Sequence, residues 1–76
     1  MDKDLKPEQL KMLDNNFTYH APKEGQPAKY EEIRAKAKEF ATMLMVDCPY
    51  SRELSLAITN LEQAVFWANA SIARNE

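Results

Sequence analysis

Three side chains that could hold a nucleotide lie close together near the end of the 76-residue sequence. Trp67, Asn69 and Arg74 share the last helix-like stretch, with polar and apolar residues between them. An aromatic face stacks on a base, an amide reads base edges, and an arginine guanidinium pairs with phosphate through two parallel hydrogen bonds. These residue types fit a nucleotide, although their spacing alone is weakly specific.

A second group of candidate side chains, Tyr19 and His20, lies in the stretch 17–26. Pro22 and Gly25 interrupt this stretch and indicate a connecting loop. Two interpretations remain open for its aromatic residues. They either pack against the neighbouring helices, or they form part of a loop that touches a ligand.

Enzyme motifs are absent from the sequence. It has neither a P-loop nor a dinucleotide glycine fingerprint. Cys48 precedes Pro49 at the end of a predicted helix, where the helix dipole does not lower a thiol pKa, so a nucleophile made of Cys48 and His20 is disfavoured. One Cys and one His cannot form a four-ligand zinc site. We therefore expect no catalysis, no metal and no cofactor.

The elements that must position the candidate side chains are all helical. Pro7 is typical of a first helical position, and the following apolar residues at steps of three and four predict a short helix over about 7–16. After the loop at 17–26, a long helix is predicted over about 27–47, ending before Pro49. Ser51 is a good N-cap for a second long helix over about 52–74.

The two long helices carry matching apolar seams. One seam comprises Tyr30, Ile33, Ala37, Phe40 and Leu44, and the other comprises Leu54, Ile58, Leu61, Val65, Ala68 and Ile72. Because the connection between the helices is short, they should lie antiparallel. The sequence therefore predicts one all-α domain over residues 1–76, an antiparallel helical hairpin with a short N-terminal helix.

Phe66 and Trp67 lie outside the seam of the last helix. Because they are adjacent, at least one should be exposed in an isolated hairpin. In the simpler interpretation, the first helix covers Phe66 and Trp67 lies at a subunit contact. In the other, Trp67, Asn69 and Arg74 lie beside a ligand held at such a contact.

The size and charge of the chain restrict its partners. A core of this size supplies about 3–5 kcal/mol of folding stability, and the single cysteine cannot add an intrachain disulfide. We therefore expect self-association to stabilise the fold, with a well-packed monomer as the alternative. The net charge of −2 disfavours DNA and RNA. No apolar run reaches the roughly 20 residues of a membrane span, and the charged start at 1–6 has no signal-peptide core behind it. We expect a cytoplasmic protein.

Residues 51–64 and 66–74 resemble the helical-hairpin domain of a known family. This family comprises the phage cyclic-nucleotide sponges that counter the CBASS and Thoeris immune systems of bacteria. The loop 17–22, the triplet 25–27, Tyr30 and the pair Ile33-Arg34 also resemble small phage members. The similarity covers most of the chain from Phe17 onward, and it fixes polar and aromatic positions as well as apolar ones.

The resemblance implies a function and a set of partners. Members assemble as homo-oligomers, often hexamers, and bind cyclic di- or trinucleotides or cyclic ADP-ribose isomers at protomer interfaces without cleaving them. A phage-encoded member would act in the host bacterial cytoplasm. The residues expected to bind such a ligand are Tyr19, His20, Tyr30, Arg34, Arg52, Trp67, Asn69 and Arg74. The alternative is a protein-interaction module that binds another protein through Phe66 or Trp67.

Overall fold

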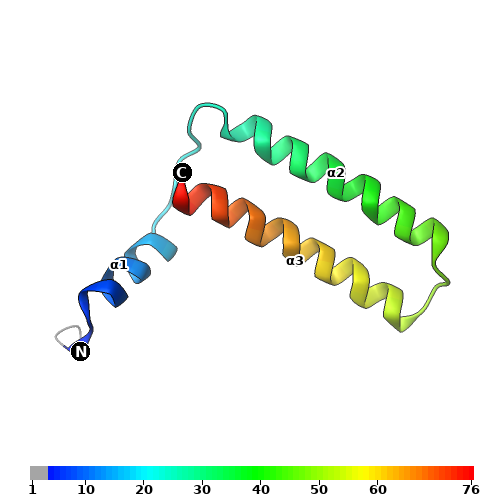
Figure 1. Cartoon of the computed structure of the whole chain (residues 1–76), viewed down its shortest axis with the longest axis horizontal. Coiled ribbons are helices and arrows are strands. Elements are labelled where there is room, and N and C mark those ends of the chain that lie inside the picture. Colours follow the sequence, from blue (N-terminus) through cyan, green and yellow to red (C-terminus); the bar gives the residue numbers. More distant parts are fainter. Residues whose placement is uncertain (1–3) are drawn as a thin grey trace.

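The computed structural model describes residues 4–76 as an all-α chain of three helices (Figure 1). The helices are α1 (Pro7–Asn16), α2 (Gln26–Asp47) and α3 (Arg52–Asn75). α2 and α3 lie side by side and antiparallel, which confirms the predicted helical hairpin. The first three residues of the charged start at 1–6 lie outside the described part of the chain.

Local signals explain where the helices begin and end. Pro7 opens α1, and the backbone N–H of Lys6 donates to Gln9 Oε1 at 2.9 Å. α2 begins at Gln26, one residue before the predicted start, directly after Gly25 in the left-handed region (φ +85°), which glycine adopts without strain. The N–H of Leu54 donates to Ser51 Oγ at 3.1 Å, so Ser51 caps α3 as expected.

The seam between α2 and α3 uses the predicted residues, but none of them is fully buried. Every predicted seam residue of α3 is half-buried, as are Tyr30, Ile33, Ala37 and Leu44 of α2. Phe40 remains 47% exposed. No apolar side chain within residues 4–76 is buried, so this single chain has no closed hydrophobic core.

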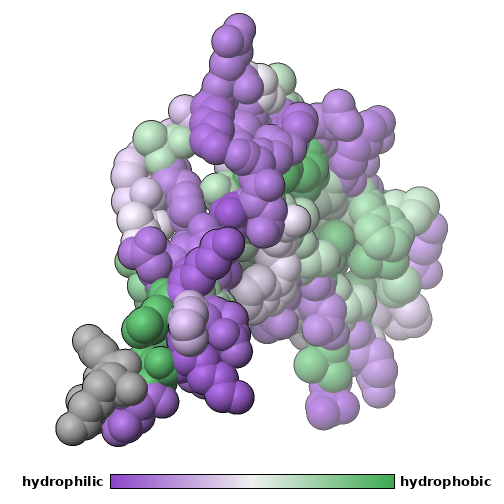
Figure 2. Space-filling model, turned by 60° about the vertical axis from the view of Figure 1, so that its left-hand side comes forward, coloured by the Kyte–Doolittle hydropathy of each residue, from purple (hydrophilic) through white to green (hydrophobic). Residues whose placement is uncertain are grey.

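The shape of the chain explains the missing core. It measures 53 × 32 × 14 Å, so its shortest dimension is little more than the roughly 10–12 Å diameter of one helix. The radius of gyration is 17.1 Å, against about 11 Å for a compact domain of this length. Stable domains usually bury their apolar faces between two packed layers. Here a single layer of helices leaves hydrophobic side chains on the surface (Figure 2).

α1 does not cover Phe66. It extends away from the hairpin beside the C-terminal end of α3 (Figure 1), and both Phe66 and Trp67 are 66% exposed. The interpretation that the first helix covers Phe66 is therefore wrong for the single chain. The expectation that at least one of the two aromatics would be exposed is confirmed. Among residues 4–76, no helix is long and apolar enough to cross a membrane.

Candidate functional site

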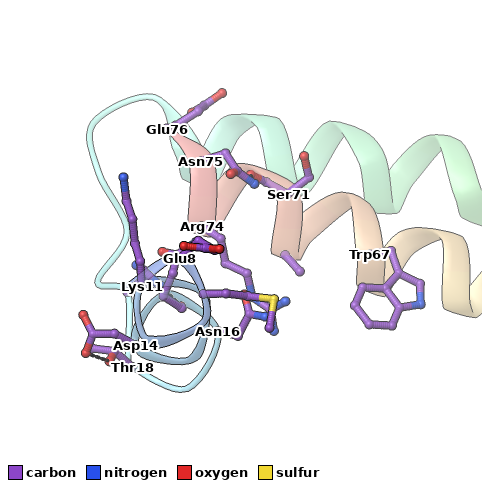
Figure 3. Close-up of a pocket in the computed structure, with 14 residues that line it drawn as sticks. Glu8, Lys11, Asp14, Asn16, Thr18, Trp67, Ser71, Arg74, Asn75 and Glu76 are labelled. Atoms are coloured by element: carbon purple, nitrogen blue, oxygen red, sulfur yellow. Dashed lines mark hydrogen bonds between the residues drawn. The ribbon is translucent and has the colours of Figure 1, made fainter. Parts of the chain in front are cut away.

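Two hollows lie at the open end of the hairpin, where α1, the connecting loop and the last turns of α3 meet, and Figure 3 shows the one between α1 and α3. The first, here called the large hollow, has a volume of about 970 Å³ and lies between α1 and α3. The second, the loop cavity, has a volume of about 420 Å³ and lies between the loop, α2 and α3. The two hollows share Asn16, Thr18, His20, Ala70 and Arg74.

The loop cavity suits an anion better than the large hollow does. Arg74 is the only permanently charged residue in its lining, and no carboxylate faces it. The large hollow is bigger, but three carboxylates line it beside the cations Lys11 and Arg74. Because like charges repel an anionic ligand, we take the loop cavity as the candidate site. Its lining comprises Asn16, Thr18, Tyr19, His20, Tyr30, Asn69, Ala70, Ala73 and Arg74.

Arg74 supplies the cation of the loop cavity. It lies in the last turn of α3 and is half-buried. Its guanidinium forms no ion pair with any residue of the described chain. A guanidinium carries five N–H donors in a fixed planar fork that matches the oxygens of a phosphate or carboxylate. The site therefore offers a charged donor that no protein acceptor occupies within residues 4–76.

Hydrogen bonds hold the loop beside the end of α1. The His20 ring donates through Nε2 to the backbone oxygen of Asn15 at 2.7 Å, because a carbonyl can only accept. The Thr18 hydroxyl donates to Asp14 Oδ1 at 3.3 Å. His20 is thus a hydrogen-bonding residue of the loop. In the neutral ring, Nδ1 remains an acceptor.

Asn69 contributes an unpaired acceptor to the wall of the loop cavity. Its Oδ1 atom is shielded from solvent and accepts no hydrogen bond from residues 4–76. A buried acceptor without a donor costs about 1–3 kcal/mol. The wall of the cavity is therefore not fully satisfied by this chain alone.

The last residue of the sequence, Glu76, joins α3 to the start of α2. Lys29 Nζ donates to Glu76 Oε2 at 2.5 Å, and Gln26 Nε2 donates to Glu76 Oε1 at 3.2 Å. The hydrogen bond from Lys29, followed by that from Gln26, lowers the pKa of the Glu76 carboxyl below its usual value of 4.5. Both donors favour the charged carboxylate.

The structure brings together six of the eight side chains expected to bind a ligand. Five line the loop cavity: Tyr19, His20, Tyr30, Asn69 and Arg74. Trp67 lines the neighbouring large hollow (Figure 3). Arg34 and Arg52 are exposed and line neither hollow. Arg52 begins α3, about 33 Å along the helix from Arg74 at 1.5 Å per residue.

Sequence reasoning missed the polar residues that fix the end of the hairpin. Gln26 and Glu76 form its junction, and Asn16 and Thr18 line both hollows. The spacing of Asp14 and Thr18, four residues apart, was a local signal for the bond between them. No periodic signal marks Gln26, which lies between the breakers Gly25 and Pro27.

The structure separates the only cysteine from the only histidine. His20 lies before the start of α2, and Cys48 caps the end of that 22-residue helix. A helix of this length spans about 33 Å. No thiol–imidazole pair can therefore form within one chain. Within residues 4–76, no group of three or more metal-binding side chains gathers.

Comparison with known proteins identifies one family. Residues 11–73 match the family described as "Acb2/Tad1, hairpin domain". The match includes most of α1, the loop, α2 and nearly all of α3, and it contains every lining residue of the loop cavity except Arg74, which follows its last residue. Comparison with curated proteins and with solved structures gives no match.

Proposed function

Since the chain belongs to the Acb2/Tad1 hairpin-domain family, the anti-CBASS and anti-Thoeris sponge family, we propose that it binds a cyclic nucleotide immune signal and withholds it from its effector. The proposed ligands are cyclic di- or trinucleotides or cyclic ADP-ribose isomers, all of which combine bases with phosphates. The protein would act in the cytoplasm of an infected bacterium, where such signals are produced.

The composition of the loop cavity is the observation that carries this proposal. Arg74, Tyr19 and Tyr30 surround one space with no carboxylate in its lining. A guanidinium forms two parallel hydrogen bonds with a phosphate, and an aromatic ring stacks on a base. The volume of about 420 Å³ lies within the range of about 300–1,000 Å³ that is typical of small-molecule sites.

Asn69 supports the same proposal. Its unpaired Oδ1 needs a donor, and the bases of cyclic nucleotides carry amino groups that can donate. Because Oδ1 is shielded from solvent in the single chain, the Asn69 amide would have to turn toward the loop cavity to accept a hydrogen bond from the amino group of a base. We propose that Asn69 contacts the base and Arg74 the phosphate.

We also propose that the functional form is a homo-oligomer, with a hexamer as the expected size. The chain exposes 6524 Å², about 1,700 Å² more than the roughly 4,800 Å² of a compact monomer of this mass. That excess is large enough for a substantial subunit interface. Trp67, which is 66% exposed at the edge of the large hollow, is then positioned to meet a second chain.

A sponge requires tight binding and no turnover, so we propose that the protein is not an enzyme. The separation of Cys48 from His20 supports this. Withholding a signal needs only slow release, which a site closed by several chains could provide. No catalytic group is needed for it.

A second candidate function is that of a protein-interaction module. Exposed apolar residues at the turn of the hairpin favour it, since Val46 is 77% and Tyr50 98% exposed. Tyrosine is one of the residue types that are enriched in protein interfaces. This surface lies at the opposite end of α2 from the loop cavity, so the two functions can be tested separately.

A thermal-shift screen against a panel of cyclic di- and trinucleotides and cyclic ADP-ribose isomers tests the proposal. A ligand present at about 100 times its Kd should stabilise the protein by about 2.7 kcal/mol. Linear dinucleotides of the same bases serve as controls. If no member of the panel raises the melting temperature, the sponge proposal fails and the interaction module takes its place.

A further inference from the structure

Gln26 is the only buried residue in the described part of the chain. It is 2% exposed. By contrast, every apolar side chain in residues 4–76 is either half-buried or exposed. Burial of an amide is unfavourable unless hydrogen bonds replace its contacts with water. The bonds made by Gln26 must therefore be the reason for its position.

Its amide joins the neighbouring loop to the end of α3, which lies 46 and 50 positions further along the sequence. Gln26 Oε1 accepts the backbone N–H of Lys23 in the loop at 2.9 Å. Gln26 Nε2 donates to the backbone oxygen of Ile72 at 3.4 Å and to Glu76 Oε1 at 3.2 Å. Lys29, in the first turn of α2, holds the other oxygen of the same carboxylate at 2.5 Å. Gln26 thus joins the loop and α2 to the end of α3, beside the ammonium groups of Lys29 and Lys23, which also donate to Glu76.

The partners of Gln26 flank the walls of the loop cavity. Tyr30 lies four residues after Gln26, on the same face of α2. On α3, Ala73 and Arg74 lie between Ile72 and Glu76, the two residues that the amide holds. A change in the bond between Gln26 and α3 should therefore move Tyr30 relative to Arg74.

We infer that Gln26 is a positioning residue of the loop cavity, which sets Tyr30 and the loop against the end of α3 through the Glu76 carboxylate. Gln26 itself is not in the lining of the cavity, so it acts through other residues. The inference rests on the proposed function for the identity of the ligand. The geometry of the cavity can be tested without any ligand.

An exchange of the two side chains tests the inference. Gln26→Glu keeps an oxygen that can accept the N–H of Lys23, but it places a second carboxylate beside Glu76 and removes the donor to Ile72. Glu76→Gln removes the carboxylate. The double variant Q26E/E76Q restores one donor and one acceptor between the two positions, with their direction reversed. Gln63→Glu is the matched control, because it makes the same change at an exposed position of α3 outside both hollows.

The first measurement is made without ligand, by NMR of the full chain. In Gln26→Glu we expect the Tyr30 ring and Ala73 methyl signals to shift, while the Lys23 amide stays protected and reports that the loop turn is intact. The double variant should return these signals toward those of the wild type, and Gln63→Glu should leave them unchanged. Unchanged Tyr30 and Ala73 signals in Gln26→Glu, or no recovery in the double variant, would overturn the inference.

The second measurement is the Kd for 3′,3′-cyclic GMP–AMP, a probe with two purines and two phosphates. Gln26→Glu should raise the Kd about tenfold, as expected for one lost hydrogen bond to a charged group, and the double variant should return to within about threefold of wild type. Equal Kd values for wild type and Gln26→Glu would overturn the positioning role. If the wild type does not bind the probe, that result counts against the proposed function, and the NMR comparison still decides the role of Gln26.

Discussion

Replacement of Arg74 by alanine should weaken ligand binding while leaving the hairpin folded. The guanidinium forms no ion pair with residues 4–76, so its removal leaves no charged protein group unpaired. Alanine is the best helix former, and the lost interaction of a cation with the C-terminal end of α3 is worth about 0.3–1 kcal/mol, or up to about 2 kcal/mol in a partly buried position. The fold should therefore survive the change.

The expected loss of binding follows from the hydrogen bonds that Arg74 would form with a phosphate. Each hydrogen bond to a charged group contributes about 1.5–3 kcal/mol, so the loss of one such bond should raise the Kd about ten- to a hundredfold. Arg74→Lys keeps the charge but loses the planar fork, and it should give an intermediate Kd.

Isothermal calorimetry with the tightest ligand from the screen measures this effect. Arg34→Ala is the matched control, because it removes the same charge from an exposed position of α2 outside both hollows. Light scattering on each variant checks that its assembly is unchanged. Wild-type affinity in Arg74→Ala, or an equal loss in Arg34→Ala, would refute the assignment of Arg74 as the phosphate contact of the loop cavity.

Three further predictions concern stability and assembly. Ser51→Ala removes the cap that accepts the N–H of Leu54 and should cost about 1 kcal/mol in urea unfolding; an unchanged midpoint would contradict the cap. The single tryptophan, Trp67, should shift its emission to shorter wavelength as the concentration rises and chains assemble; constant emission, with a monomer at high micromolar concentration by light scattering, would refute the homo-oligomer. Hydrogen bonds from Lys29 and Gln26 lower the pKa of the Glu76 carboxyl in the folded chain, so the unfolded chain binds a proton at this carboxyl more readily. The ionised carboxylate therefore stabilises the folded state fully above about pH 4.5, and this stabilisation is lost as the pH falls from there through the folded-state pKa. The melting temperatures of wild type and Glu76→Gln should therefore converge in acid, and a constant difference from pH 6 to pH 3 would contradict the role of Glu76.

The hairpin could be predicted because its determinants are local. Pro7, Ser51 and Pro49 mark helix ends through the backbone geometry of their immediate neighbours. The two seams follow from the helical period alone, and the short connection between the helices leaves only an antiparallel pairing. Among the predicted seam residues, Phe40 differs most from the expected burial, because α3 covers it incompletely.

The position of α1 and the junction at Gln26 could not be predicted in the same way. The loop leads α1 away from Phe66, and no periodicity in the sequence sets that direction. The bonds of Gln26 join residues 46 and 50 positions apart, so no local pattern reveals them. The candidate residues on α3 lie together because one helix carries them, whereas Arg34 and Arg52 are set apart by the lengths of α2 and α3.

The central claim is that this chain binds a cyclic nucleotide and does not consume it. Calorimetric titration of the unmodified 76-residue chain with each member of the cyclic-nucleotide panel, followed by denaturation and chromatography of the released ligand, tests both halves of that claim together. We predict a Kd in the micromolar range or tighter for at least one member, with the ligand recovered intact. Release of a cleaved or linear nucleotide would contradict the sponge mechanism, and the absence of measurable heat with every member of the panel would contradict cyclic-nucleotide binding itself.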